Sequence, residues 1–188
     1  AFRDELTGLP GRRALNERMQ RLGRNYVLAM SDVDHFKRFN DTHGHDVGDQ
    51  VLRLVASKLS KVNGGGRAYR YGGEEFAVVF AGKTLDECMP HLEEIREIIA
   101  SYDIKLRNPD RPQDDHQGRQ RRAGSGASSV SVTVSIGVAE RQAEQRSPDE
   151  VLKSADQALY NAKGAGRNCV MAFGQARRGA VRMDEAAG

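Results

Sequence analysis

The sequence has no tryptophan, only two cysteines and no long apolar run. Cys88 and Cys169 lie far apart and lack the paired spacing of a zinc site or a disulfide framework, so we expect two buried thiols in a reducing, cytoplasmic compartment. No stretch approaches the roughly 20 apolar residues of a membrane-spanning helix. Aromatic residues make up only 6%, and no strand interleaves exposed aromatics with arginines, which argues against RNA recognition. We therefore expect neither a membrane segment in this chain nor a nucleic-acid partner.

Net charge and length are also modest. The formal charge is +3 over 188 residues, and the basic side chains are spread along the chain. This length predicts one domain with a single core. Because the sequence starts at Ala1 without an initiator methionine, we expect a fragment of a longer protein. An upstream regulatory domain, and any membrane anchor, would then lie outside this chain.

Apolar spacing and turn residues predict the order of helices and strands. Thr84 and Ser147 each begin a capping sequence for a helix, whereas Pro90 marks either a kink or a first turn. This order predicts an α+β fold with a mostly antiparallel, ferredoxin-like central sheet surrounded by helices. The predicted helices are 12–22, a short one from Phe36, 48–61, one after Thr84 and one after Ser147; the predicted strands are 26–30, 67–71, 76–81, 130–139 and 168–173.

Two segments have almost nothing apolar to bury. Lys105 to Ser129 is rich in Arg, Asp, Gln, Gly and Ser, which predicts a flexible insertion within a domain covering residues 1–173. The alternative to a tolerated insertion is that its arginines contact a regulatory partner or nucleic acid. Residues 174–188 are predicted to be a flexible C-terminal tail.

Two pairs of carboxylates carry the first functional signal. Asp32 and Asp34 end a buried strand, and Glu74 and Glu75 follow the Gly72-Gly73 turn of a predicted hairpin. Neighbouring strands would bring the pairs together, and clustered carboxylates repel one another unless protonated or bridged by a cation. Magnesium held this way keeps positions for substrate phosphates, and glycines permit their close approach. The alternative is a solvated acidic hairpin whose glycines only satisfy turn geometry.

Further motifs distinguish these alternatives. They are, in order, 4–9 (DELTGL), 32–41 (DVDHFKRFND), 44–49 (GHDVGD), 70–76 (RYGGEEF), 132–139 (VTVSIGVA) and 155–168 (ADQALYNAKGAGRN). Together these motifs, over about residues 4 to 173, resemble the GGDEF-domain diguanylate cyclases.

The resemblance implies a nucleotidyl-cyclase-type site with three groups of residues. The implied ligands of Mg²⁺, or of Mn²⁺, are Asp32, the carbonyl of Val33, Glu74 and Glu75. The implied catalytic residues are Glu74 as general base, Glu75 and Lys37. The implied GTP-binding residues are Phe36, Lys37, Asn40, His45, Asp49, Gly72, Gly73, Lys163 and Arg167.

The chemistry of these side chains suits the roles that the resemblance implies. An asparagine with an aspartate matches the acceptor and donor edge of guanine and not that of adenine. Ammonium and guanidinium groups satisfy a triphosphate. Taken alone, Lys163 and Arg167 would only complement the carboxyl end of a helix. We predict that Asp34 is a helix N-cap, that His43 is an exposed helix-end residue and that His35 acts through its backbone.

The implied reaction condenses two GTP into cyclic di-GMP and two pyrophosphates. Each chain would hold one GTP, so a homodimer is implied, with two active sites meeting face to face. Many family members carry an inhibitory product site, Arg-x-x-Asp, before the glycine pair. Asn63 and Gly66 occupy those positions here, which predicts that this site is missing. The rival interpretations are an idle GTP- or cyclic-di-GMP-binding signalling module and a mononucleotide cyclase or polymerase-like transferase.

Overall fold

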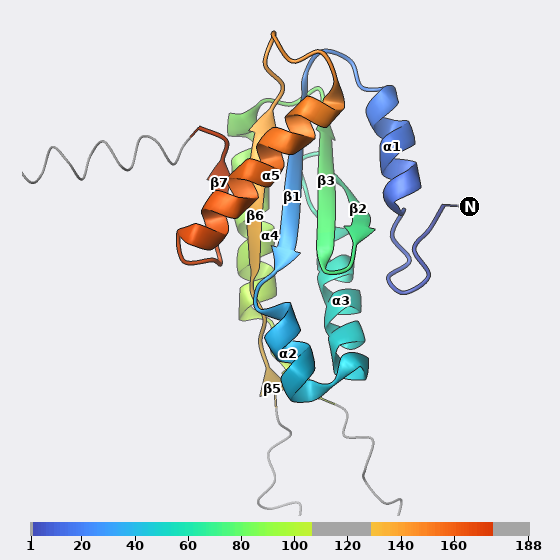
Figure 1. The fold of residues 1–188 in the computed structure, drawn as a ribbon, viewed down its shortest axis with the longest axis vertical. Coiled ribbons are helices and arrows are strands. Elements are labelled where there is room, and N and C mark those ends of the chain that lie inside the picture. Colours follow the sequence, from blue (N-terminus) through green and yellow to red (C-terminus); the bar gives the residue numbers. More distant parts are fainter. Residues whose placement is uncertain (1, 107–128, 175–188) are drawn as a thin grey trace, which may run out of the picture.

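The computed structural model describes residues 2–106 and 129–174. Five strands form one sheet in the order β2-β3-β1-β6-β7, and only the β6–β7 pair is parallel. This arrangement confirms the predicted α+β fold with a mostly antiparallel sheet (Figure 1). The strands are β1 (Tyr26–Val33), β2 (Arg67–Gly72), β3 (Glu75–Ala81), β6 (Val134–Glu140) and β7 (Val170–Ala172). The helices are α1 (Arg12–Gln20), α2 (Phe36–His43), α3 (His45–Leu59), α4 (Leu85–Ser101) and α5 (Pro148–Gly164).

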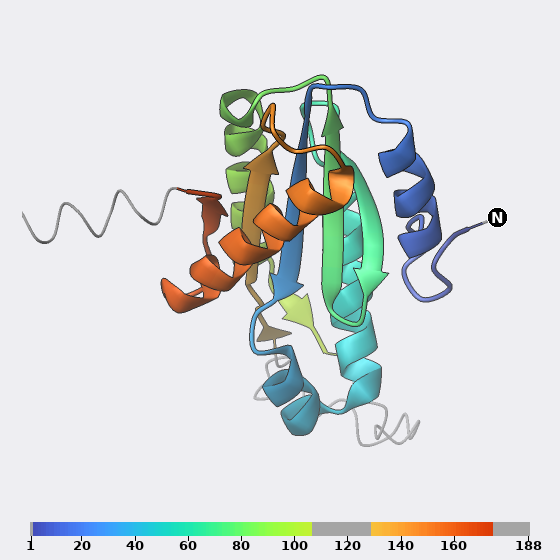
Figure 2. The same ribbon diagram turned by 45° about the horizontal axis from the view of Figure 1, so that its top comes forward.

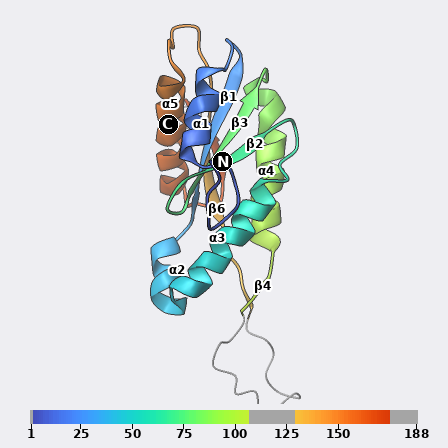
Figure 3. The ribbon, with the colours of Figure 1, turned by 90° about the vertical axis from the view of Figure 1, so that its right-hand side faces the viewer.

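Side-chain alternation along β1 divides the core into two layers. Val27 and Ala29 pack with α3 and α4 on one face of the sheet, whereas Leu28 and Met30 pack with α1 and α5 on the other. Figures 1 to 3 show these two helical layers on either side of the sheet. Because side chains alternate with a period of two, Asp32 continues the set of Leu28 and Met30. Its carboxylate therefore belongs to the α5 face.

Capping contacts at the helix termini explain why the predicted starts of α4 and α5 agree with the structure. Thr84 accepts a hydrogen bond from the Glu87 amide at 3.3 Å, and the Glu87 carboxylate accepts one from the Thr84 amide at 3.2 Å. Pro90 lies inside α4 and does not end it. At α5, the Glu150 carboxylate accepts from the Ser147 amide at 3.4 Å. The predicted helix 48–61 begins three residues earlier, at His45, directly after the left-handed Gly44.

The predicted strand 130–139 is interrupted in the structure. A short ribbon pairs β4 (Ile104–Lys105) with β5 (Ser129–Val130), and the main sheet resumes only at Val134. The first and last residues of the predicted insertion are therefore hydrogen-bonded strand residues. The rest of that insertion, 107–128, and the predicted tail beyond Gly174 lie outside the described residues. Within the described ranges, none of the helices is long and apolar enough to cross a membrane.

Candidate active site

The predicted carboxylates meet where β1 ends beside the β2–β3 hairpin. The Cα register pairs Asp32 with Glu75, so the two side chains leave the same face of the sheet. The Val33 amide donates to the Glu74 carbonyl at 3.3 Å, which ties the hairpin turn to the end of β1. The prediction that neighbouring strands bring the two pairs together is confirmed for these residues.

A lysine from α5 completes this cluster. Lys163 Nζ contacts Asp32 Oδ2 as a hydrogen-bonded ion pair across 131 residues of sequence. Asp32 is 5% exposed, and its second oxygen, Oδ1, is buried without a hydrogen-bond partner. A buried carboxylate oxygen without a partner is energetically costly. The site therefore offers one free oxygen ligand beside a single positive charge.

The two hairpin glutamates have perturbed protonation. Burial, reinforced by the negative charge of Asp32, raises the pKa of Glu74 above its usual 4.5. Burial and the charges of Asp32 and Asp156 raise the pKa of Glu75, with Lys163 and Arg12 opposing the shift. Each carboxylate thus raises the cost of ionising its neighbours, which is the condition that a bound cation relieves. Even so, among the described residues no three His, Cys, Asp or Glu side chains converge closely enough to hold a metal ion as they stand.

The hairpin turn itself is open to its surroundings, and the Arg70 side chain holds its backbone in place. Gly73 has a φ of 51°, which suits glycine, and a Cβ built on Gly72 or Gly73 would meet nothing within 4 Å. Arg70 donates to the Gly73 carbonyl and pairs with Asp4 at 2.9 Å. A hollow of about 350 Å³ lies between this turn and the N-terminal segment, and Arg12 also lines it. The structure therefore leaves space beside the glycines, and Arg70 fixes their backbone.

The predicted guanine-binding residues share the corner between α2 and α3. Asn40 Oδ1 is buried without a partner, and it lies against Gly48, where a Cβ would be only 1.8 Å away. Asp49 is the next residue of α3 and is half-buried, and His45 is exposed at the start of the same helix. An amide oxygen that lacks a partner and an adjacent carboxylate form a polar corner suited to a base edge.

The predicted phosphate-binding residues lie on α2 and after α5. Lys37 is exposed in the first turn of α2, which directly follows the end of β1 (Figure 1). The Phe36 side chain is 8% exposed and belongs to the core. Only the backbone of Phe36 is thus available to a substrate, as one of the free amides of a helix start. Arg167 is exposed in the turn that follows α5.

The structure contradicts the prediction that Asp34 is the N-cap of a helix. The N-terminal cap of α2 is His35, in a left-handed conformation with φ 55°, and no side chain caps the helix. Asp34 instead accepts hydrogen bonds from Thr133 Oγ1 at 2.7 Å, Ser135 Oγ at 2.6 Å and the Asn168 amide at 3.0 Å. The N-cap prediction is wrong because these three donors hold the carboxylate against β6 and the α5–β7 turn.

Two smaller predictions also need correction. His43 ends α2 as predicted, but it is half-buried and its ring lies 4.6 Å from that of Phe39. Cys88 is buried as predicted, whereas Cys169 is only half-buried and its thiol lies 3.5 Å from the Ala162 carbonyl. Both contacts are local, because Phe39 lies one turn earlier in α2 and Ala162 lies near the end of α5, seven residues before Cys169.

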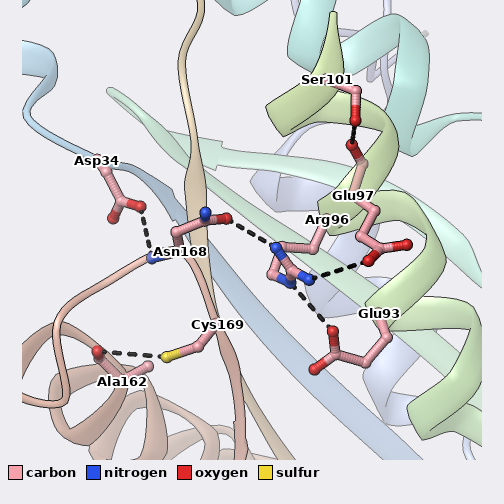
Figure 4. A network of polar contacts seen from close by, with 8 residues as sticks. All are labelled: Asp34, Glu93, Arg96, Glu97, Ser101, Ala162, Asn168 and Cys169. Atoms are coloured by element: carbon pink, nitrogen blue, oxygen red, sulfur yellow. Dashed lines mark hydrogen bonds and ion pairs between the residues drawn. The ribbon is translucent and has the colours of Figure 1, made fainter.

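Sequence reasoning missed the polar network around the α5–β7 turn (Figure 4). Arg96 Nη1 on α4 donates to Asn168 Oδ1 at 2.9 Å, and Arg96 Nε pairs with Glu93 at 3.1 Å. Asn168 belongs to a motif that the sequence displays, but nothing in the spacing of α4 singles out Arg96. Its partner is 72 residues away.

This fold and site define a class: an α+β domain with a five-stranded sheet, whose central strand ends in a carboxylate cluster faced by a lysine. The chain belongs to the family "Diguanylate cyclase, GGDEF domain", whose model matches residues 1–169.

Similar proteins agree with this assignment. The chain is 39% identical over 175 residues to diguanylate cyclase VdcA of Vibrio cholerae and 35% identical over 179 residues to response regulator PleD of Caulobacter vibrioides. It covers 47% and 36% of their respective lengths, and 91% of this chain is matched in each. The crystal structure of the GGDEF domain of DgcB from Caulobacter crescentus, in complex with c-di-GMP, superposes with a TM-score of 0.78 at 37% identity. That match covers 92% of this chain and 93% of DgcB's. The chain thus spans half or less of these two full-length relatives.

Proposed function

We propose that this domain is a diguanylate cyclase that condenses two GTP into cyclic di-GMP and two pyrophosphates. The observation that carries the proposal is the ion pair between Lys163 and Asp32 beside Glu74 and Glu75. It joins a phosphate-binding cation to a group of carboxylates at the open Gly72-Gly73 turn. VdcA is named a diguanylate cyclase, and the DgcB structure contains the corresponding product.

The donor chemistry of this site suits a divalent cation, and its carboxylates would draw closer together around the ion than they stand in this structure. Asp32 Oδ1 is buried without a partner, and two neighbouring carboxylates have raised pKa values. All of these donors are oxygens, which Mg²⁺ prefers and Mn²⁺ also accepts. We assign the ligand set to Asp32, the Val33 carbonyl, Glu74 and Glu75. The bound ion would supply positive charge to the phosphoryl oxygens, and Lys163 would then be released from Asp32 to the substrate.

The remaining predicted residues divide between the base and the triphosphate. Asn40 and Asp49 meet the guanine edge, with His45 at the rim of the same corner. Lys37, Lys163 and Arg167 supply charge-assisted hydrogen bonds to the phosphates, and the free amide of Phe36 adds to them. Gly72 and Gly73 permit close approach because no side chain stands in front of the turn.

The reaction proceeds by nucleotidyl transfer. A ribose 3′-hydroxyl attacks the α-phosphorus of the other GTP, the bond to the bridging oxygen of the β-phosphate breaks, and pyrophosphate leaves. Glu74 accepts the hydroxyl proton, a role favoured by its raised pKa. Lys37 and Lys163 stabilise charge on the departing phosphates. A second, identical step closes the ring, and because each chain holds one GTP, two chains meet as a homodimer.

The same proposal covers domain limits and location. Residues 1–173 form the catalytic domain, 105–129 an insertion and 174–188 a tail. Any regulatory segment of the full-length protein would lie outside residues 1–173, and this chain covers only 47% and 36% of the lengths of VdcA and PleD. A cytoplasmic location suits two free cysteines and GTP as substrate.

The direct test is incubation with GTP and Mg²⁺, followed by separation of the products by mass. Cyclic di-GMP with two pyrophosphates supports the proposal, and both Asp32→Asn and Glu74→Gln should abolish it. Cyclic GMP would instead support a mononucleotide cyclase. GTP or cyclic di-GMP binding without turnover, in a chain fused to a dimerising segment, would support the idle signalling module.

Product feedback supplies a further prediction. Asn63 lacks the charge needed to bind a phosphate, and Gly66 has no side chain at all, so cyclic di-GMP should not inhibit through an Arg-x-x-Asp site. We expect unchanged initial rates when micromolar product is added. Asn63 does line a cavity of about 180 Å³ with Lys58 and Lys61 between α3 and α4. The prediction would be contradicted if cyclic di-GMP inhibited noncompetitively through Asn63. In that case the inhibition would persist in the Lys58→Ala and Lys61→Ala variants and disappear only in Asn63→Ala.

A further inference from the structure

The turn between α5 and β7 adopts an unfavourable backbone conformation. Arg167 and Asn168 are consecutive non-glycine residues with φ of 65° and 46°. Each left-handed residue of this kind is disfavoured by its Cβ, and such a pair persists only where surrounding contacts hold it. The turn contains Arg167 and directly follows the end of α5, where Lys163 lies. Its conformation therefore directs Arg167 and holds the end of the helix that carries Lys163.

Two contacts fix Asn168 from opposite sides (Figure 4). Its amide donates to Asp34 Oδ2 at 3.0 Å, and its side-chain Oδ1 accepts from Arg96 Nη1 at 2.9 Å. Asp34 is 7% exposed and is itself held by Thr133 and Ser135. The first contact therefore anchors the turn to a rigid, buried point two residues beyond Asp32.

The second contact comes from the opposite helical layer. Arg96 lies on α4, whose apolar side chains pack on the sheet face away from α5. Its side chain is 15% exposed and is oriented by Glu93 at 3.1 Å and Glu97 at 3.8 Å. A guanidinium held by carboxylates presents its remaining N–H groups in a fixed direction. Arg96 is thus a preorganised donor aimed at the turn.

We propose that Asp34, Asn168 and Arg96 are positioning residues that hold Lys163 and Arg167 toward the triphosphate. The inference rests on the proposed function, since it concerns how the same site binds the phosphates of GTP. Its new element is that α4, which contributes no residue to the site, sets triphosphate affinity through the single Arg96–Asn168 hydrogen bond. Displacement of α4 would loosen the turn and weaken phosphate binding while leaving the guanine corner intact.

The test compares ligands with and without the outer phosphates. Asn168→Gly keeps the left-handed backbone and the amide that donates to Asp34, but removes the acceptor for Arg96. Arg96→Leu removes the donor. We expect each variant to weaken a non-hydrolysable GTP analogue about tenfold with Mg²⁺, because a charge-assisted hydrogen bond is lost. GMP affinity should change less than about twofold, and the double variant should behave like either single one.

Two further measurements separate positioning from general damage. Amide hydrogen exchange over residues 163–169 of the nucleotide-free protein should be faster in Arg96→Leu than in wild type. Glu94→Gln is the matched control, because it removes an exposed carboxylate from the same helix and leaves Arg96, Glu93, Glu97 and Asn168 in place. It should leave both nucleotide affinities unchanged.

Three outcomes would overturn the inference. Equal losses for the GTP analogue and GMP would indicate a structural role, and unchanged affinity in both variants would show that the contact does not matter. Additive effects in the double variant would mean that the two residues act separately. A failure of the proposed function would give different results. The wild-type protein would not bind the GTP analogue, or the Lys163→Ala variant would bind it as well as wild type does. Either result would also refute the inference about triphosphate positioning.

Discussion

Asp32 combines two opposed requirements in one side chain. Its Oδ2 is neutralised by Lys163, whereas Oδ1 is buried without a partner and lies close enough to Glu74 and Glu75 to raise both pKa values. A group that is only half neutralised destabilises the cation-free fold. Under the proposed function that unsatisfied charge would attract a divalent ion, so function at this position would oppose stability.

Glu74→Gln should therefore stabilise the cation-free protein while abolishing turnover. The pKa of Glu74 in the folded protein is raised above 4.5. The folded protein therefore holds a proton on Glu74 that the unfolded chain has already released. The free energy of unfolding consequently falls as the pH rises from 4.5 through the pKa of the folded state. The neutral glutamine avoids this loss. Thermal unfolding with a chelator should show a Tm higher by roughly 1–3 °C at pH 8.

The pH dependence supplies the control for that prediction. The Tm difference should shrink to nothing below pH 4.5, where Glu74 is protonated in both folded and unfolded chains. Glu144→Gln, an exposed carboxylate beyond the opposite end of β6, should change nothing at either pH. A lower Tm for Glu74→Gln at pH 8 would refute the electrostatic argument.

Gly48→Ala tests the guanine corner. A Cβ at this helical position would lie 1.8 Å from Asn40 Oδ1 and 3.3 Å from the Phe36 ring, so the amide must rotate away. Alanine itself favours the helix by about 1 kcal/mol, so the fold should survive. We expect GTP affinity to fall at least tenfold through the lost base contact, measured by calorimetry with a non-hydrolysable analogue.

The controls for Gly48→Ala lie in the same helix pair. Ser57→Ala, at an exposed position of α3, raises helix propensity without approaching Asn40 and should leave affinity unchanged. In an Asn40→Ala background, Gly48→Ala should have no further effect, since the displaced group is already gone. A full additional loss there would show that the alanine acts elsewhere.

The sequence predicts a site residue correctly when its contacts are close in the sequence or follow from strand pairing. Glu74 and Glu75 follow a glycine turn, and Asp32 ends a strand, so local pattern and strand pairing place all three. Asp34 is different, because its partners Thr133 and Ser135 lie about 100 residues away. A local rule assigns such an aspartate to a helix cap, and only the β1–β6 register reveals the donors that take its place.

At the scale of elements, α5 approaches the sheet more closely than any side chain would permit. A Cβ on Gly137 of β6 would lie 2.0 Å from the Leu159 backbone nitrogen and 2.3 Å from the Ala155 carbonyl oxygen. Both obstacles are backbone atoms, which cannot rotate away. This contact sets how far α5, and with it Lys163, stands from Asp32.

Gly137→Ala should therefore destabilise the fold and displace Lys163. Overpacking against backbone should cost about 3 kcal/mol, which corresponds to a Tm lower by roughly 6–12 °C. Gly23→Ala, where a Cβ meets nothing within 4 Å, is the matched control and should change Tm by less than about 2 °C. A normal Tm in Gly137→Ala would show that α5 can move away from the sheet at little cost.

The elements were predictable where local signals are complete. Capping sequences at Thr84 and Ser147 place α4 and α5, and the apolar run 77–80 after the glycine turn places β3. The interruption between Val130 and Val134 was not predictable, because the alternating pattern runs through it without a break. The Thr133 carbonyl still accepts from the Asp34 amide at 2.9 Å, one residue beyond the last paired positions of β1 and β6. Before that point the chain pairs with β4 instead, at Ser129–Val130.

At the scale of the whole molecule, the described residues of one chain provide one carboxylate cluster and one corner proposed to bind guanine. The proposed product contains two guanosines joined by two equivalent phosphodiester bonds. One bound GTP supplies only one 3′-hydroxyl and one α-phosphate, so ring closure requires a second site facing the first. Turnover should then depend on encounter between chains, whereas nucleotide binding should not.

Dilution distinguishes these two processes. Below the dimer dissociation constant, the rate of cyclic di-GMP formation per chain should rise in proportion to protein concentration, because the active species is a pair. Binding of a non-hydrolysable GTP analogue, which needs one chain, should keep a constant affinity over the same range. Adding excess Glu74→Gln protein should suppress wild-type turnover by forming mixed pairs in which one carboxylate cluster cannot deprotonate its hydroxyl. A rate per chain that stays constant over a hundredfold dilution, with no suppression by the variant, would mean that one chain completes both bonds, and the face-to-face arrangement would have to be abandoned.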